Sequence, residues 1–438
     1  MSETQRKRTR LIRSGLALAV AAPLAAPVQA QYEVRYGIGL EQDDNIFLSE
    51  EDTEDDTVVT NTLGVRYVQD SPALEADVEG QARHLHYVDD TADDETLTDL
   101  SATATWRILP DQLHLFAQDE AAEVRSSARD RGSPATTQSA NSYVVGPDLI
   151  FGSGTVNRIT VSARAGEAYF ENGTDSERAA IGARWARQIS AVSEISARVQ
   201  RQEVTYTEPD PVAEDFERDD VFVGWSRELR SRQIDVELGA FEIRREDDSL
   251  DELDGGQGVL QLTQFVGVTT SFTIRGERAV EDAGARLLSA TDSAVSLAGT
   301  DAIVTGDLVE RTDIELGVNR RGPDYQLRAS LIASEEDFEQ APEDIEATGA
   351  RVALDYFLGP RSTVFLALAG STQEFTQSDR EDDDATLRVA YQRGLTRSLD
   401  LDLRYDYVER RSNVDGESFE ANRVGAFLTY RWGPGFED

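Results

Sequence analysis

The sequence predicts an all-β protein in which the strands form one antiparallel sheet, closed into a barrel that spans a membrane. Three observations lead to this prediction. Apolar and polar residues alternate over segments of about 9–13 residues, as in strands that contact an apolar medium on one face. Short and long connections between these segments alternate along the chain. Beyond the N-terminus, no stretch approaches the roughly 18–20 consecutive apolar residues that a spanning helix requires.

The alternation is clearest near the two ends of the chain. Residues 32–40 place Tyr32, Val34, Tyr36, Ile38 and Leu40 on one face. The segments 178–185, 399–407 and 423–432 repeat the pattern, with arginines, acids and glycines on the opposite face. Aromatic residues near the strand ends fit the girdles of a membrane interface: Tyr67, Tyr87, Trp106, Trp185, Trp225, Tyr356, Tyr391 and Trp432.

The connections predict the number of strands. Nine short turns and ten long, mostly acidic loops separate the segments, which gives 20 strands, with 18–20 plausible because the segments 257–281 and 302–320 are ambiguous. An even number places both termini at the end of the barrel with the short turns. Short periplasmic turns and long extracellular loops are typical of outer-membrane barrels, whose closure leaves no unpaired edge.

The first thirty residues have the features of a secretory signal peptide. A basic stretch with Arg6, Lys7 and Arg8 precedes a short apolar region, and Val28-Gln29-Ala30 fits the small-residue cleavage rule. We therefore expect a cleaved Sec signal peptide at 1–30 and a single barrel domain at 31–438, exported to the outer membrane of a Gram-negative cell. An amphipathic helix or a membrane anchor is the alternative for this segment.

Composition and charge exclude several classes of protein. The formal net charge of −40 argues against a nucleic-acid partner. The absence of cysteine removes disulfides, thiolate metal sites and cysteine nucleophiles. A soluble β-sandwich or propeller would have to bury the polar face, which a core cannot do with so many unpaired charges. The arginines on that face are Arg66, Arg107, Arg164, Arg184, Arg198, Arg328, Arg351, Arg388 and Arg404.

A water-filled lumen accepts these arginines readily. A barrel of more than about 16 strands leaves an aqueous lumen unless a plug fills it. We expect the residues that contact a solute to be among Arg164, Arg184, Arg351, Arg388 and Arg404.

The sequence gives little support for catalysis or for a bound metal. His84 and His86 share one strand face, and Asp89 and Asp90 could complete a metal site, but a role at the membrane interface fits them better. His114 has no evident nucleophile as a partner. The acidic loops lack the spacing of a calcium-binding loop, so a solvated surface is the simpler interpretation, with divalent bridging to lipopolysaccharide as the alternative. We expect no catalytic residue, no metal and no cofactor.

The last predicted strand carries a second signal. Arg423, Gly425, Leu428 and Tyr430 resemble the signal that outer-membrane assembly machinery reads on a C-terminal strand. The assembly machinery, outer-membrane lipid and lipopolysaccharide are therefore expected partners.

Three segments resemble one family of outer-membrane proteins. Residues 41–47 (EQDDNIF), which follow the first strand, are similar to the opening of the putative β-barrel porin family, the second group so named. Residues 394–405 and 421–432 are similar to its end. The resemblance implies a porin-like channel and an association with exopolysaccharide production, hence a polysaccharide as the transported partner, whereas the predicted lumen arginines favour an anionic solute. A non-conducting accessory barrel of a polysaccharide-export system is the alternative, and an outer-membrane enzyme is a third.

The longest predicted loop, 281–301, differs from the others because it is poor in acids and carries Leu287, Leu288, Val295 and Leu297. Apolar side chains are unfavourable in water, so this loop should pack against another surface. We expect it to fold inward as a constriction opposite wall arginines such as Arg164, Arg184 and Arg351, with an additional external hairpin as the alternative.

Overall fold

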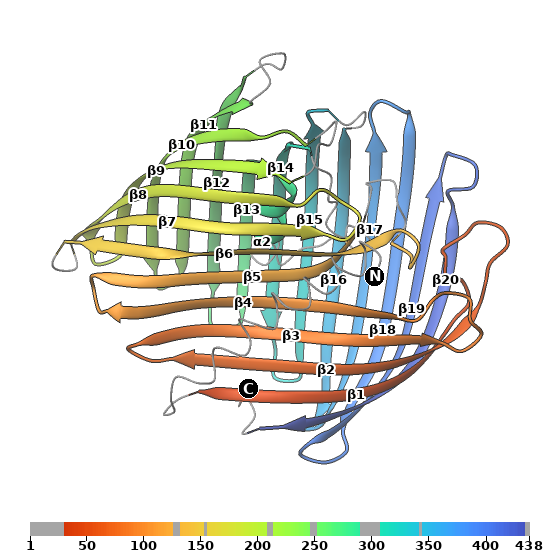
Figure 1. Cartoon of the computed structure of the whole chain (residues 1–438). Helices are drawn as coiled ribbons and strands as arrows, with labels where there is room; N and C mark the ends of the chain where they lie inside the picture. Colours follow the sequence, from red (N-terminus) through yellow and green to blue (C-terminus); the bar gives the residue numbers. More distant parts are fainter. Residues whose placement is uncertain are drawn as a thin grey trace.

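The protein is a closed, 20-stranded antiparallel barrel in the computed structural model, which describes residues 30–125, 132–152, 156–207, 213–245, 252–289, 307–340 and 344–433 (Figure 1). The strands follow one another around the barrel in chain order: β1 (Gln31–Asp43), β2 (Asp56–Asp70), β3 (Leu74–Tyr87), β4 (Glu95–Leu109), β5 (Leu113–Arg125), β6 (Thr137–Phe151), β7 (Asn157–Phe170), β8 (Ser176–Ser190), β9 (Ser193–Tyr206), β10 (Phe216–Leu229), β11 (Arg232–Arg245), β12 (Leu253–Val266), β13 (Thr270–Glu281), β14 (Val309–Arg321), β15 (Tyr325–Phe338), β16 (Ile345–Gly359), β17 (Ser362–Phe375), β18 (Arg380–Gly394), β19 (Leu399–Ser412) and β20 (Phe419–Trp432). One helix, α2 (Ala283–Ser289), follows β13. No helix in the described ranges is long and apolar enough to cross a membrane.

Closure occurs between the first and last strands. Residue Val34 of β1 lies opposite Trp432 of β20, and the pairing continues to Asp43 opposite Arg423. Each strand therefore has hydrogen-bonded neighbours on both sides, as a sheet in lipid requires. The strands on the near and far walls cross in Figure 1 because barrel strands are tilted.

The two ends of the barrel differ as the sequence predicts. Nine short connections, together with the start of β1 and the end of β20, form one end, which we call the turn rim. Ten connections, most of them longer, form the other end, the loop rim. The count of 20 strands is confirmed, and the two ambiguous segments resolve into β12, β13 and β14.

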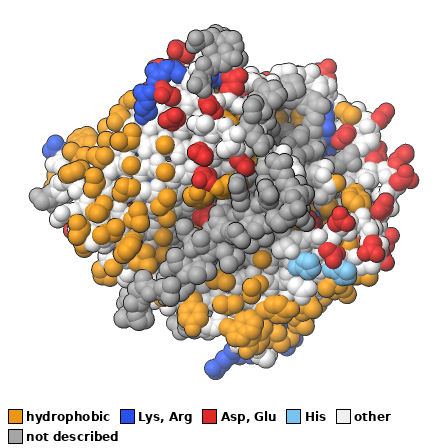
Figure 2. All heavy atoms as spheres, viewed as in Figure 1, with side chains coloured by type: hydrophobic (Ala, Val, Ile, Leu, Met, Phe, Trp, Pro, Cys, Tyr) orange, Lys and Arg blue, Asp and Glu red, His pale blue; other side chains and the backbone are white. Residues whose placement is uncertain are grey.

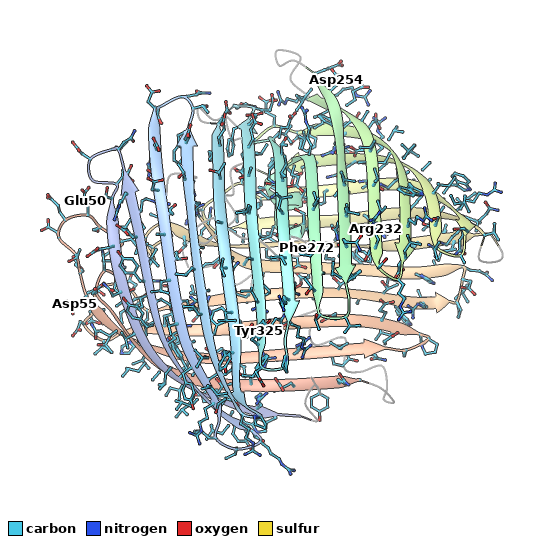
Figure 3. All side chains as sticks on the ribbon, turned by 180° about the vertical axis from the view of Figure 1, so that it is seen from behind. Glu50, Asp55, Arg232, Asp254, Phe272 and Tyr325 are labelled. Carbon is cyan, nitrogen blue, oxygen red and sulfur yellow. The ribbon has the colours of Figure 1, made fainter. Side chains whose placement is uncertain are left out.

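The outer face is apolar over the strands and acidic near the loop rim. Figure 2 shows hydrophobic side chains over the strands and acidic side chains gathered toward the loops on the face in view. In Figure 3, Glu50, Asp55 and Asp254 belong to the loop rim, whereas Arg232, Phe272 and Tyr325 belong to strand ends at the turn rim. All four tryptophans of the chain lie on the turn-rim half of the strands: Trp106, Trp185, Trp225 and Trp432.

One aromatic residue does not belong to the girdle that the sequence predicted. Tyr87 is buried on the inner face, packed with Ile46 and Val58. The prediction that Tyr87 belongs to the girdle was wrong because the two-residue alternation places Tyr87 on the same inner face as Arg83, and not on the lipid-facing side.

The inner face changes character along the barrel axis. Most of its length carries charged and polar side chains, but near the loop rim it carries buried apolar clusters. One cluster joins Val204, Phe216, Phe241 and Ile243 from β9, β10 and β11. Another joins Val309, Phe338, Ile345 and Phe375 from β14 to β17. The loop rim is therefore lined by packed side chains rather than by an open polar wall.

Some of the acidic residues in the loops accept hydrogen bonds from the end of the preceding strand. Four strands end in an inward aromatic residue whose backbone N–H donates to an aspartate of the following connection: Tyr87 to Asp94, Phe170 to Asp175, Tyr206 to Asp215 and Phe338 to Asp344. The N···O distances run from 2.7 to 3.3 Å. These aspartates satisfy backbone donors that strand pairing leaves free. They are not only a solvated surface.

The rims predict an orientation that can be measured on whole cells. Both termini lie at the turn rim, so we expect this rim to face the periplasm and the loops to face outward. An epitope inserted between β11 and β12 should bind antibody on intact cells, whereas one inserted at Gly359 should not. If the epitope at Gly359 binds antibody and the one between β11 and β12 does not, the barrel has the opposite orientation.

Candidate functional site

The predicted lumen arginines all lie on the inner face, but they do not form one site. Arg164 of β7 and Arg184 of β8 line the same recess. Arg388 and Arg404 lie on the wall formed by β18 and β19 and share Asp406, at 2.5 and 3.4 Å. Arg351 lies on β16, opposite Ala369 of β17, away from both groups. Strand register decides these groupings, because all five residues satisfy the same alternation.

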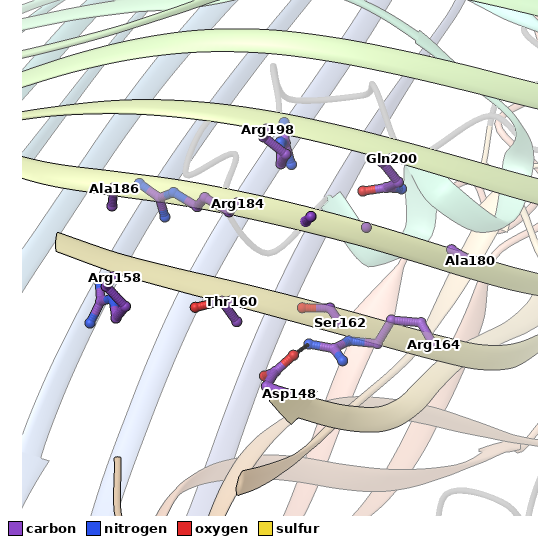
Figure 4. Close-up of a pocket in the computed structure, with 12 residues that line it drawn as sticks. Asp148, Arg158, Thr160, Ser162, Arg164, Ala180, Arg184, Ala186, Arg198 and Gln200 are labelled. Carbon is purple, nitrogen blue, oxygen red and sulfur yellow. Dashed lines mark hydrogen bonds and ion pairs between the residues drawn. The ribbon is translucent and has the colours of Figure 1, made fainter. Parts of the chain in front are cut away.

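The recess on β7–β9 concentrates four arginines. Arg158 and Arg198 join Arg164 and Arg184 around a volume of about 340 Å³ (Figure 4). Thr160, Ser162 and Gln200 add hydroxyl and amide groups to its wall. Arg184 and Arg198 are direct cross-strand partners, an arrangement that is unfavourable for like charges unless anions stand nearby.

Three of the four arginines have a carboxylate partner. Arg164 is 2.7 Å from Asp148, Arg198 is 2.7 Å from Glu237, and Arg184 is 3.4 Å from Glu194. Arg158 makes no ion pair within the described part of the chain. The Arg184 side chain is about half exposed and its ion pair is long, so its guanidinium can exchange its partner for a solute anion at little cost.

Two aromatic rings hold the guanidinium groups against the wall. The Arg164 guanidinium lies 4.7 Å from the centroid of the Phe116 ring, and that of Arg198 lies 4.1 Å from the Phe222 ring. Stacking fixes the plane of each group and leaves its N–H edges for anions. Phe116 and Phe222 were not among the residues predicted from the sequence, although both lie on the polar face of their strands.

A second recess of about 900 Å³, on β1–β5, has the opposite charge balance. Its wall carries Asp77, Glu79, Asp99 and Glu120 against two arginines, Arg35 and Arg66. Leu287 of α2 also contributes to its lining. The lumen therefore has an acidic wall and a basic wall with the α2 segment between them.

The helix α2 turns into the lumen and docks on strands far from its own in the sheet. It follows β13 but contacts β5, β6 and β7. Leu287 and Ala283 are buried against the inward residues Val124, Ala140 and Phe170. The Nε2 of Gln118 on β5 donates to the carbonyl oxygen of Leu288, at 3.0 Å.

Two ion pairs, one buried and one partly buried, tie α2 to the wall. Asp282 lies 2.8 Å from Arg178 of β8, and the side chains are only 3% and 7% exposed. Arg286 lies 2.5 Å from Glu336 of β15. Asp282 also caps the helix, because its Oδ1 accepts the Ala285 N–H at 2.7 Å. Gly284 is required here, since a β-carbon would meet the Arg178 guanidinium 2.0 Å away.

These contacts determine the charge of Asp282 and Arg286, which we call the tether residues. Burial by itself would raise the pKa of Asp282, but the Arg178 guanidinium and the Ala285 N–H outweigh it and hold that pKa below its ordinary value. Burial would lower the pKa of Arg286, but Glu336 outweighs it and raises that pKa. Both tether residues are therefore charged at neutral pH.

The described start of the predicted 281–301 loop folds inward, as expected from the sequence. The wall arginine that it contacts differs from the expected ones. The arginine that meets the loop is Arg178, whereas Arg164, Arg184 or Arg351 had been expected. Residues 290–301 lie outside the described residues.

The three histidines lie apart. His86 Nδ1 is 2.9 Å from Asp94, and His84 Nδ1 is 3.1 Å from the hydroxyl of Thr96. Both are exposed on the outer face of β3 near the loop rim. His114 faces the lumen from β5, opposite Arg107. Within the described ranges, no group of three or more histidine and acidic side chains is placed to hold a metal ion.

The proposed assembly signal lies on the closing strand. Arg423 of β20 pairs with Asp43 of β1 at 2.6 Å. Leu428 and Tyr430 are exposed on the outer face, where the Tyr430 ring meets that of Trp432 edge-on at 4.6 Å. Gly425 lies on the inner face, where a β-carbon would come within 2.6 Å of the Phe427 ring. The signal peptide predicted at 1–30 lies outside the described residues apart from Ala30.

Comparison with known proteins identifies a porin family over the C-terminal strands. The family model described as "Putative beta-barrel porin 2" matches residues 345–432, from β16 to the end of β20. The family resemblance seen in the sequence is confirmed over this segment. No curated protein matches the chain.

Solved structures similar to this chain include three outer-membrane proteins. The siderophore receptor PirA from Pseudomonas aeruginosa is 13% identical, with a TM-score of 0.47, over 93% of this chain and 81% of the receptor. The FrpB iron transporter from Neisseria meningitidis is 8% identical, with a TM-score of 0.48, over 95% and 83% of the two chains. OccK2 from Pseudomonas aeruginosa is 8% identical, with a TM-score of 0.41, over 93% and 98%.

The family match and the apolar outer face agree on location. The chain is an outer-membrane β-barrel with a porin-like fold.

Proposed function

We propose that the barrel is a channel through which polar solutes diffuse, that it favours anionic solutes, and that the docked α2 segment limits its conductance. The four-arginine recess on β7–β9 is the observation that supports this proposal most strongly. Guanidinium groups that face a water-filled lumen and have exchangeable partners form a weak, multipoint site for carboxylate, phosphate or sulfate groups.

The two walls would act on a solute together. The acidic recess on β1–β5 and the arginine recess on β7–β9 produce a field across the lumen that orients a solute carrying both polar and anionic groups. Weak sites of this kind allow a solute to enter and also to leave. The chain has no Gly-x-x-x-x-Gly-Lys motif and therefore no nucleotide-driven transport of its own.

The family resemblance suggests a polymeric solute. A polysaccharide with carboxylate groups would present anions at intervals along a chain, and the lumen carries separate arginine groups at Arg164/Arg184 and Arg388/Arg404. Export of such a polymer is therefore the narrower form of the proposal.

A non-conducting accessory barrel is the second candidate. The observation that favours it is α2, which occupies part of the lumen through two ion pairs, one buried and one partly buried. Planar-bilayer recording of the purified protein separates the two candidates, because an accessory barrel gives no steps of conductance.

We assign no enzymatic role. Hydrolase activity of the purified protein that disappears in His84→Ala, His86→Ala or His114→Ala would contradict this assignment.

Charge removal from the arginine recess should weaken anion selectivity. In an Arg184→Gln/Arg198→Gln variant we expect the ratio of anion to cation permeability to fall by about two- to fivefold, since two of four local positive charges are lost. The reversal potential in a salt gradient measures this ratio. Glu79→Gln/Asp99→Asn, in the acidic recess, is the matched control and should shift the ratio the other way. Shifts in the same direction in both variants would contradict an effect of the local wall charge on selectivity.

A further inference from the structure

Within the described ranges, outward-facing arginines that lack a carboxylate partner lie at only one end of the barrel. Five arginines near the turn rim are exposed on the lipid-facing side of their strands: Arg187, Arg227, Arg232, Arg320 and Arg393. Their orientation follows from alternation with exposed apolar residues. Arg187 lies two residues from Trp185, and Arg227 follows Val221, Val223 and Trp225 in steps of two.

None of these five arginines has a carboxylate partner in the described part of the chain. Arg232 donates to the Gln264 amide oxygen at 2.8 Å, which is a neutral partner. The outward positions of the strand ends at this rim hold apolar, aromatic and neutral polar residues beside the arginines, and no aspartate or glutamate.

The outward arginines at the loop rim are different. Each has an acidic neighbour on the same face: Arg201 with Glu217, Arg244 with Asp219, Arg278 with Glu310, and Arg411 with Glu409. The lipid-facing surface is thus acidic at one end and purely cationic at the other. Random placement of surface charge does not explain why only one group lacks partners.

Three of the five arginines are close together. Arg187, Arg227 and Arg232 lie on β8, β10 and β11, and Arg230 lies in the turn between the last two strands. In the sheet, Arg187 is opposite Ile195, which is opposite Trp225. We call Arg187, Arg227, Arg230 and Arg232 the arginine patch. It is bordered by Trp185 and Trp225, which anchor at the level of lipid headgroups.

We propose that the arginine patch binds the phosphate groups of anionic glycerophospholipids in the leaflet that surrounds the turn rim. A guanidinium at the edge of an apolar belt can extend to the headgroup layer and bind a phosphate through two N–H groups. Lipid phosphate supplies the negative charge that the protein itself does not supply at this rim. An acidic protein partner could provide the same charge, but the apolar residues that alternate with the arginines would then be covered by a polar surface.

Fluorescence quenching can measure this lipid preference directly, because two of the four tryptophans border the patch. A Trp106→Phe/Trp432→Phe background leaves only Trp185 and Trp225 as reporters. The full-length protein is folded into phosphatidylcholine vesicles that contain either brominated phosphatidylglycerol or brominated phosphatidylcholine. We expect the anionic brominated lipid to quench more strongly at an equal mole fraction. The reverse background, Trp185→Phe/Trp225→Phe, reports on β4 and β20, where we expect a smaller preference.

Two neighbouring residues on opposite faces provide a matched pair of variants. Arg187 lies opposite Asn157, and Arg158 lies opposite Ala186, one position along the same ladder. Arg187→Gln should lower the preference for anionic lipid by about fivefold, the effect of one cation at an anionic surface. Arg158→Gln should leave the lipid preference unchanged and lower anion selectivity.

The outcomes are distinguishable. A quenching ratio of one between the two brominated lipids in the patch background would overturn the proposal, as would an equal preference in the Arg187→Gln and Arg158→Gln variants. Heat-modifiable electrophoretic mobility, measured for every variant, confirms that each barrel is folded. Because the readout is lipid binding, failure here leaves the proposed channel function untouched.

Discussion

Replacing Arg178 by alanine should release α2 from the wall and raise the single-channel conductance. The substitution leaves the Asp282 carboxylate buried without its cation, and removal of one partner from a buried pair costs about 3–5 kcal/mol. This cost exceeds the roughly 1.5–3 kcal/mol that the apolar contacts of Leu287 contribute, so docking should be weakened although the Arg286–Glu336 pair remains. Planar-bilayer recording measures the effect.

A double substitution tests the cause. Arg178→Ala/Asp282→Ala removes both charges and should restore part of the low conductance, because no uncompensated charge remains. If the single variant is folded but conducts like the parent protein, the buried ion pair does not hold the constriction.

The same ion pair predicts how the channel responds to pH. The pKa of Asp282 is lowered in the folded protein, so its contribution to docking is complete above the ordinary aspartate pKa of about 3.9 and is lost as the pH falls through the lowered value. Arg286 has a raised pKa and stays charged throughout this range. Conductance should therefore be constant from neutral pH to about pH 5 and rise only in stronger acid.

Replacing Tyr430 by aspartate should impair assembly of the barrel. Tyr430 faces the lipid from the strand that closes the barrel on β1, and a charge on the lipid face costs up to about 2–4 kcal/mol, depending on depth. Leu428→Asp, one step farther from the turn rim, should have the larger effect. The yield of heat-modifiable protein in outer-membrane fractions measures assembly, with periplasmic degradation as the expected fate of the remainder.

The neighbouring residue is the control for this experiment. Thr429 lies between Leu428 and Tyr430 on the lumen side and lines the recess on β1–β5. Thr429→Asp adds the same charge to the same strand but exposes it to water, so the yield should be close to that of the parent protein. An equal loss of yield for Thr429→Asp and Tyr430→Asp would mean that strand pairing, and not the lipid face, decides assembly.

The strands and their number could be predicted from the local pattern alone, and so could the face of most side chains, with Tyr87 as the exception. Lipid outside and water inside impose a two-residue period on every strand, so local pattern is enough to place Ile38 outward and Arg164 inward. Turn residues interrupt that period between strands, as at Pro110, Gly322 and Pro360.

Which inward residues meet depends on the pairing of strands across the whole barrel. Arg164 and Arg184 share a recess with Arg158 and Arg198, whereas Arg351 does not, because register and strand adjacency are set across the whole sheet. The docking of α2 is still less local. Leu287 is more than a hundred residues from its contacts at Val124 and Phe170, and only closure of the barrel brings β13 across the lumen from β5–β7. The two-residue period predicts which face of its strand a residue occupies. It contains no information about what lies on the far side of the lumen.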